Sequence, residues 1–216
     1  MSEQPTLQRG LKSAALAAAG RGWRVFPLRP GSTVPAVRDW RSRATDDAER
    51  IERCWDTGPF NVGLLLCASG LLLLDLSPAG PGDRPPLDLR LPGVHDGADV
   101  LAVLLERRAA RFPFETYTVA GPGGGQQYYF AHPPGSPCTP RLPVAWHVEM
   151  RCAGYTPAAG SVVRGGAYGL VHDGAPQAVP DWLTGGPLHP VPARPAGARN
   201  PLDSRSRPRT TSPRPS

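Results

Sequence analysis

The sequence predicts an α+β fold in which covering helices pack on a largely antiparallel sheet. Helix-like and strand-like segments follow one another in a mixed order, which is typical of this class. One apolar run, residues 71–76, is too short for a helix and predicts a strand that is buried on both faces. Several further strand-like segments follow this run, and glycine-rich turns separate them.

The first quarter of the chain predicts two helices and one strand. Residues 7–19 are rich in alanine, a strong helix former, and a Gly-Arg-Gly segment ends this helix. Residues 23–28 alternate in character as a strand does, and residues 29–40 form a loop with two prolines and a glycine. Thr45 is placed to cap a helix that runs to Trp55, because acidic residues fill its first turn. We expect this helix to be an amphipathic helix that covers the sheet, without a further role.

Two apolar strands are predicted next, residues 61–66 and residues 71–76. The segment from Cys67 to Gly70 is short and ends in glycine, which predicts a tight hairpin between them. Asp75 lies near the end of the second strand, where desolvation of its charge is costly unless a partner compensates it. A metal ion is one such partner. Alternatively, Asp75 caps a turn by accepting from nearby backbone amides, as Asp often does before Ser-Pro.

The next part of the chain predicts a loop, a helix and a series of strands. Residues 79–95 are dense in Pro and Gly and form the loop, whereas residues 98–111 have helical apolar spacing. Residues 146–151 predict a strand in which His147 and Glu149 point to one face. The remaining elements are strands at residues 116–119 and 126–131, a hairpin of residues 161–163 and 167–171, and a short helix at residues 180–183.

Composition divides the chain into a domain, residues 1–185, and an Arg/Pro-rich tail, residues 186–216. The 25 Gly and 28 Pro residues approach the content at which part of a chain is disordered, and we expect that part to be the tail. The tail holds six Arg and one Asp, and therefore carries +5 of the net charge of +6. The basic character of the chain is thus weak evidence that its folded part binds nucleic acid.

The four cysteines give no recognisable pattern. They form no CxxC pair and lie far from any His at ligand spacing, so the sequence predicts neither a zinc site nor a disulfide framework. The N-terminus lacks the apolar region of a secretory signal, and the most apolar run, residues 62–74, is too interrupted and too short to span a membrane. We therefore expect a cytoplasmic protein without membrane partners.

Three stretches are candidates for chemistry. The first is Asp75 with Ser77, at the end of the leucine-rich strand. The second is residues 120–127, where consecutive glycines let the backbone approach a phosphate, although no Lys-Ser/Thr follows as in a Walker loop. A flexible hairpin is the alternative for this stretch. The third is Glu149 with Arg151 on one face of a strand, which could equally be a surface ion pair of little energetic worth.

Taken in this order, the stretches resemble the N-terminal domain of bifunctional DNA primase/polymerases, in the archaeo-eukaryotic primase superfamily. The likeness covers roughly residues 8–184, from the alanine-rich helix and the following GWRVFPLRPG to the hairpin that begins with GSVV. Residues 70–78 are similar to the family's first acidic motif, residues 118–130 to its glycine-rich second motif, and residues 148–151 to its third. The resemblance implies a prim-pol fold for residues 1–185.

The resemblance also implies a site and a function. Asp75 and Glu149 would hold Mg²⁺ or Mn²⁺ and act in catalysis together with Gln127. The nucleotide would lie against Gly123, Gly124, Gly125 and Arg151. The implied activity is that of a nucleotidyltransferase, a DNA primase or polymerase acting in DNA replication or primer synthesis. Its partners would be DNA or RNA, a nucleoside triphosphate and a helicase or other replication protein on a separate chain.

Departures from the family's motifs predict inefficient catalysis. The first motif is an Asp-x-Asp pair in the family, whereas Ser77 stands at its second position here. Gln127 stands where the family has His, Ala120 where it usually has Arg, and Glu149 where many members have Asp. Ser77 offers a metal only a neutral oxygen, and Gln127 cannot carry a positive charge. The alternatives are an inactive module that binds nucleic acid or a protein, and a structural protein without a ligand.

Overall fold

The computed structural model describes residues 3–138 and 140–184. The helices in this part are α1 (Glu3–Gly20), α2 (Trp40–Arg43), α3 (Ala48–Trp55), α4 (Gly97–Arg108) and α5 (Asp181–Thr184), with short 3₁₀ turns η1 (Cys67–Ser69), η2 (Leu87–Leu89) and η3 (Pro122–Gly124). The strands are β1 (Val25–Leu28), β2 (Asn61–Leu65), β3 (Leu71–Leu76), β4 (Thr118–Ala120), β5 (Gln126–Ala131), β6 (Leu142–Ala145), β7 (Val148–Arg151), β8 (Tyr155–Pro157), β9 (Val162–Val163), β10 (Gly166–Ala167), β11 (Gly169–His172) and β12 (Gln177–Ala178).

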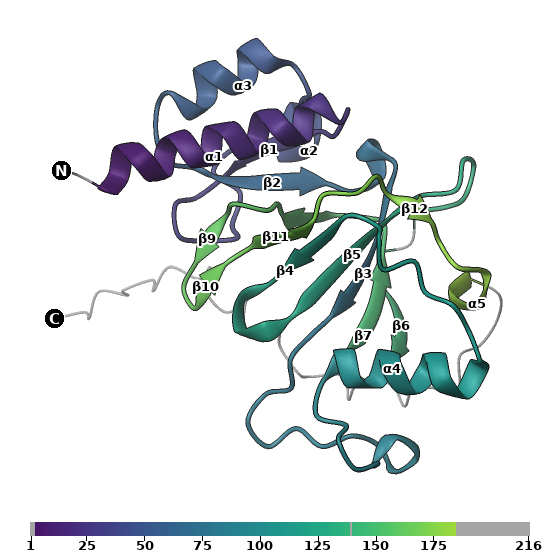
Figure 1. Ribbon diagram of the computed structural model, residues 1–216. Helices are drawn as coiled ribbons and strands as arrows, with labels where there is room; N and C mark the ends of the chain where they lie inside the picture. The colour runs from purple at the N-terminus through teal and green to yellow at the C-terminus, as the bar shows by residue number, and fades with distance from the viewer. Residues whose placement is uncertain (1–2, 139, 185–216) are drawn as a thin grey trace, which may run out of the picture.

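The strands form two main sheets, which confirms the predicted α+β class (Figure 1). The large sheet has the order β11-β4-β5-β3-β7-β6, and β12 adds to β5 as its one parallel partner among the described strands. The small sheet has the order β1-β2-β8 and is antiparallel. Helices α1 and α3 cover the small sheet, whereas α4 packs against β3 and β7 of the large sheet. A short ribbon of β9 and β10 completes the strands.

The leucine-rich strand β3 lies at the centre of the large sheet and is buried on both faces, as predicted. Leu71 and Leu73 belong to a core shared with α1 and the small sheet. Leu72 and Leu74 point the other way, into a core shared with α4. Each fully buried leucine contributes about 1.5–3 kcal/mol of transfer free energy. Two covered faces therefore explain why this strand has an uninterrupted apolar run.

The predicted hairpin between residues 61–66 and 71–76 is wrong. Strand β2 pairs with β1 and β8, whereas β3 pairs with β5 and β7, so the two strands belong to different sheets. The turn η1 between them is followed by Gly70, whose positive φ of 64° changes the direction of the chain. Both strands are buried on both faces, so their apolar pattern does not distinguish between a shared sheet and two packed sheets.

Two element boundaries differ from the prediction for local reasons. Helix α3 is capped by Asp47, whose side chain accepts from the backbone N–H of Arg50, and not by Thr45. Strand β7 starts at Val148, because His147 has a φ of 57° and lies in the turn from β6. His147 therefore does not share a strand face with Glu149. Positive φ at a non-glycine residue leaves little trace in sequence.

Several short elements were not predicted at all. These are α2, which begins where a loop was expected to end, and the strands β6, β8 and β12. The expected disorder of residues 186–216 lies outside the described residues. No helix in the described part is long and apolar enough to cross a membrane.

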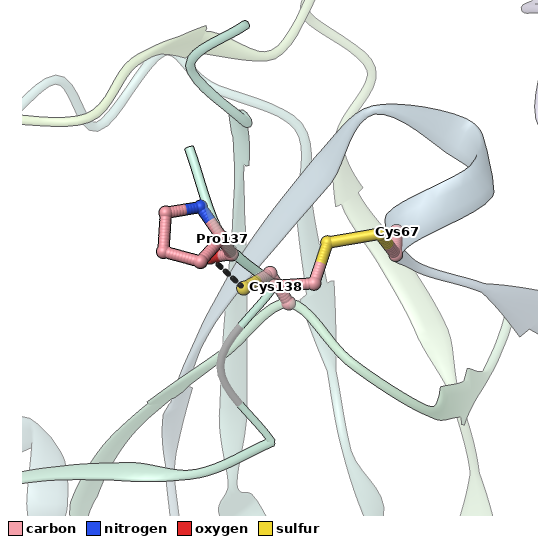
Figure 2. Close-up of a disulfide and its surroundings, with 4 residues drawn as sticks. Cys67, Pro137 and Cys138 are labelled. Carbon is pink, nitrogen blue, oxygen red and sulfur yellow. Dashed lines mark hydrogen bonds between the residues drawn. A yellow bond between two sulfur atoms is a disulfide. The ribbon is translucent and has the colours of Figure 1, made fainter. Parts of the chain in front are cut away.

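The structure contains a disulfide between Cys67 and Cys138, contrary to the prediction from cysteine spacing (Figure 2). The two residues are 71 positions apart in the chain, yet their Cα atoms are 6.2 Å apart. Cys67 lies in η1, at the N-terminal end of β3, and Cys138 lies in the loop between β5 and β6. Antiparallel pairing of β3 with β5 brings these two connections to one end of the sheet. Sequence spacing alone does not show this proximity.

Candidate functional site

Three predicted site residues lie side by side across the large sheet. Asp75 of β3 is opposite Gln127 of β5 on one side and opposite Glu149 of β7 on the other. Directly opposed residues in antiparallel strands point to the same face, with Cβ atoms about 4.5–5.5 Å apart. The structure therefore brings together one residue from each of the three separate sequence stretches.

A cavity of 610 Å³ adjoins this row and is formed by residues of both sheets, α2 and the glycine-rich loop. Asp75 and Gln127 line it, whereas Glu149 is not among the described residues that line it. The charged residues of its wall are one carboxylate and three arginines: Asp75, Arg41, Arg141 and Arg151. The cavity is thus rich in positive charge, which suits an anionic ligand.

Arg151 neutralises Asp75 in the wall of the cavity. Its Nη2 donates to Asp75 Oδ2 at 2.9 Å, and each side chain keeps 22% of its exposure. Arg151 is opposite Leu73 in the register, so it reaches Asp75 diagonally across the pair of strands. The interpretation of Asp75 as a backbone turn cap is therefore wrong. The guanidinium of Arg151 balances the charge of Asp75, which is the role that the first interpretation gave to a metal ion.

A second arginine pairs with Glu149. Arg141, which precedes β6, donates through Nε to Glu149 Oε1 at 2.7 Å. Glu149 was expected to be free for a metal or to pair with Arg151, but Arg151 bonds to Asp75 instead. Each of the two predicted metal ligands is thus held by its own arginine.

Gln127 is held in a buried network of hydrogen bonds. Its Nε2 donates to Thr156 Oγ1 at 3.2 Å, and its Oε1 accepts from the hydroxyl of Tyr129 at 3.0 Å. Thr156 belongs to β8, so this network connects the large sheet to the small one. Burial, and next the neighbouring Tyr117, raise the pKa of Tyr129 far above its ordinary value, which keeps its hydroxyl protonated as a donor. Gln127 thus has a structural role as well as a place in the cavity wall.

The glycine-rich loop follows β4 and lies at the rim of the cavity. Gly123 and Gly124 have φ values of 75° and 92°, a region that other residues rarely adopt. The loop is closed by the N–H of Gly121, which donates to the carbonyl of Gly125 at 2.7 Å. Gly125 lines the cavity, and a side chain there would approach the carbonyl oxygen of Leu76 to 3.2 Å. Of the three glycines predicted to contact a nucleotide, only Gly125 is among the residues lining the cavity.

A comparison with protein families agrees with this arrangement. The family model of the bifunctional DNA primase/polymerase N-terminal domain matches residues 15–182. The chain belongs to this family. The match covers all the strands that carry Asp75, Gln127 and Glu149, and it confirms the resemblance inferred from the sequence motifs. Among curated proteins, none matches the chain.

The prim-pol family implies a pair of divalent ions, and the donor set of this chain does not fit such a pair. Two-metal sites need several hard oxygen ligands with net negative charge. Here Asp75 and Glu149 each face an arginine, and Ser77, which lines the cavity, provides a neutral hydroxyl. A cation placed at Asp75 would also meet the positive charges of Arg41, Arg141 and Arg151. No catalytic step through a metal follows from this arrangement.

Several residues of the cavity were not found by sequence reasoning. The aromatic side chains of Trp40 and Tyr155 line it and contact each other edge to face, with ring centroids 4.8 Å apart. Arg41 lies over the Trp40 ring at 4.3 Å and also lines the cavity. Trp40 is the last residue of the predicted loop, Arg41 follows that loop, and Tyr155 comes from a strand that was not predicted. In the sequence, only the aromatic character of Trp40 and Tyr155 could have indicated that they line a binding cavity.

Replacement of Arg151 by Leu should raise the pKa of Asp75. Burial already raises this pKa above its ordinary value, and Arg151, Gln127 and Arg141 partly oppose the rise. A folded-state pKa above the unfolded-state value means that Asp75 supports the fold fully below its unfolded pKa. This contribution is lost as pH rises through the folded pKa. In Arg151→Leu the loss should extend to higher pH.

Carboxyl-carbon NMR titration of Asp75 measures this shift, and urea unfolding across pH 3–8 measures its effect on stability. Arg53→Ala is the control, because Arg53 forms an exposed ion pair with Glu49 in α3. An unchanged or lower pKa of Asp75 in Arg151→Leu would contradict the pairing.

Proposed function

We propose that this prim-pol domain binds the phosphates of a nucleoside triphosphate or of DNA or RNA in its cavity and polymerises inefficiently or not at all. It would serve DNA replication or primer synthesis as a binding module beside a replication protein. The observation that carries this proposal is the arginine pairing of both carboxylates, Asp75 with Arg151 and Glu149 with Arg141. Arginines in these positions favour phosphate and disfavour a catalytic metal.

The layout of the cavity supports a nucleotide as the ligand. Arginine presents a planar fork of donors that matches the oxygens of a phosphate. Arg41 and the rim residue Gly125 would face the phosphates, while Tyr155 in the cavity wall offers an aromatic surface for a base. Base stacking on aromatic side chains is worth about 1–3 kcal/mol per base and tolerates any sequence. The cavity of 610 Å³ is also within the usual range for small-ligand sites.

The competing function is nucleotidyl transfer that depends on Mg²⁺ or Mn²⁺, with Asp75 and Glu149 as the metal ligands. Family membership favours it, because the family is one of primases and polymerases. It requires both arginines to move away from the carboxylates on metal binding. The two functions therefore differ in their metal dependence, which an experiment can separate.

Titration of the purified protein with a fluorescent deoxynucleoside triphosphate, with and without Mn²⁺, tests the proposal. We expect binding without Mn²⁺ and no extension of a labelled primer. Arg41→Ala should weaken nucleotide binding about tenfold, or about 1.4 kcal/mol. Arg43→Ala is the matched control, since Arg43 lies in the same short helix but not in the cavity wall.

No binding by the wild type at millimolar nucleotide would leave only a structural or protein-binding role. Binding that needs Mn²⁺, together with primer extension, would promote the enzyme function. Equal losses in Arg41→Ala and Arg43→Ala would place the phosphates outside this cavity.

A further inference from the structure

Potential metal ligands gather at the end of the large sheet that carries the disulfide. His132 directly follows β5, Cys138 lies in the β5–β6 loop, and Cys152 directly follows β7. One ligand atom from each of these three residues lies within 4.8 Å of the others. Cys67 contributes a fourth atom, because its sulfur is bonded to that of Cys138 (Figure 2). Four residues from three connections between strands thus gather at one end of the sheet.

The chemistry of this cluster suits zinc. Three sulfurs and one imidazole nitrogen form a common set of ligands for structural Zn²⁺, which is tetrahedral with Zn–S distances of about 2.3 Å. Tetrahedral geometry places such sulfurs about 3.8 Å apart. For His132, Cys138 and Cys152, the observed upper limit of 4.8 Å needs only a small contraction. Cys152 is 4% exposed, and the others lie in turns and loops whose side chains can adjust.

We propose that Cys67, Cys138, Cys152 and His132 form a Zn²⁺ site when the disulfide is reduced. A dithiol reductant supplies two electrons and two protons, so that the Cys67–Cys138 bond breaks, two thiols form and the reductant becomes a cyclic disulfide. The three cysteines then bind Zn²⁺ as thiolates and release three protons, while neutral His132 donates a ring nitrogen. Disulfide and metal are alternative states of one cluster, because Cys67 and Cys138 cannot take part in both.

The two states hold the wall of the cavity differently. The β5–β6 loop leads from Cys138 to Arg141, and Cys152 is the neighbour of Arg151 in the chain. The disulfide fixes only Cys67 and Cys138, whereas the metal would also fix the end of β7 through Cys152. Metal binding would therefore brace both arginines that pair with the carboxylates.

Cobalt substitution tests the site, since Co²⁺ reports thiolate ligands by absorption. The full chain is reduced with dithiothreitol, the reductant is removed without oxygen, and Co²⁺ is titrated into reduced and oxidised protein. We expect one equivalent to bind the reduced protein and to give the thiolate-to-cobalt charge-transfer absorption that marks sulfur ligation. Zn²⁺ should abolish this absorption by displacement. The oxidised protein should show no thiolate-to-cobalt absorption, and addition of Zn²⁺ should not change its spectrum.

Variants assign the ligands. Cys152→Ser and His132→Ala should each lower Co²⁺ affinity about tenfold or more, and Cys152→Ser should also weaken the thiolate absorption. Cys54→Ser is the matched control, because Cys54 lies in α3 and outside the cluster, and it should bind as the wild type does. His132→Ala decides the assignment if Cys152→Ser does not fold. Absence of thiolate absorption in the reduced wild type, equal binding by the oxidised protein, or loss of binding in Cys54→Ser would each overturn the proposal.

Discussion

The double variant Ser77→Asp, Gln127→His should bind Mn²⁺ more tightly than the wild type and should gain primer extension. Asp at position 77 would stand two residues after Asp75, where both carboxylates can share an ion. Three carboxylates would then face Arg141 and Arg151, so a metal could compete for them. Even outer-shell groups change metal affinity by about 10–100-fold, so a new direct ligand should have at least that effect.

The histidine at position 127 has two tasks in this variant. It must supply a cationic donor beside the incoming phosphates, and it must replace the bonds that Gln127 makes with Thr156 and Tyr129. Each single change should do less than the pair, because ligands of one site act as a unit. Gln127→His alone should also lower stability, since it breaks part of the buried network.

Extension of a labelled primer and Mn²⁺ titration should be measured for the wild type, both single variants and the double variant. Ser136→Asp is the control, because it adds the same charge at an exposed position outside the cavity. A wild type as active as the double variant would show that the arginine pairs do not prevent catalysis. A double variant that binds metal and nucleotide no better than the wild type would show that these two substitutions do not restore a metal site. It would favour the function of a binding module.

The parts of the fold that sequence predicted are those with a strong local signal. The leucine run gave β3, the alanine-rich segment gave α1, and the run from Gln126 to Ala131 gave β5 with its bounds. The partners of these elements were harder to predict. Strands β2 and β3 were assigned to one hairpin although they lie in two sheets, because pairing depends on contacts between distant residues. The disulfide was missed for the same reason.

The candidate site, like the fold, was predicted from the sequence only in part. The order of the motifs grouped Asp75, Gln127 and Glu149, and these residues lie opposite one another in β3, β5 and β7. Each motif lies on one of three strands that pair with each other, so the set of motifs contains indirect information on strand pairing. The arginine partners were not predicted. Arg141 and Arg151 lie within ten residues of each other, but only the paired strands show that Arg151 reaches Asp75 and Arg141 reaches Glu149. This pairing changes the expected chemistry more than the motif substitutions do.

Gly97→Ala should destabilise the protein by about 2–5 kcal/mol, from overpacking and weakened hydrogen bonds. Gly97 is the first residue of α4, and a Cβ there would lie 2.3 Å from the carbonyl oxygen of His147 and 3.1 Å from the Cα of Leu76. Both contacts are with backbone, which cannot rotate away as a side chain can. The backbone N–H of Ser77 donates to that His147 carbonyl, and Gly97 N–H donates to the carbonyl of Ser77. The methyl group would therefore push α4 away from the end of β3.

Urea unfolding followed by tryptophan fluorescence measures this loss, with Gly10→Ala as the matched control. Gly10 lies within α1, and a Cβ there would meet nothing within 4 Å. Alanine is the better helix former by about 1 kcal/mol, so Gly10→Ala should raise the free energy of unfolding. Because Ser77 lies in the cavity wall, Gly97→Ala should also weaken nucleotide binding at temperatures where the variant is still folded. A stability within about 0.5 kcal/mol of the wild type would show that α4 can shift without cost, and that the helix does not fix the position of Ser77.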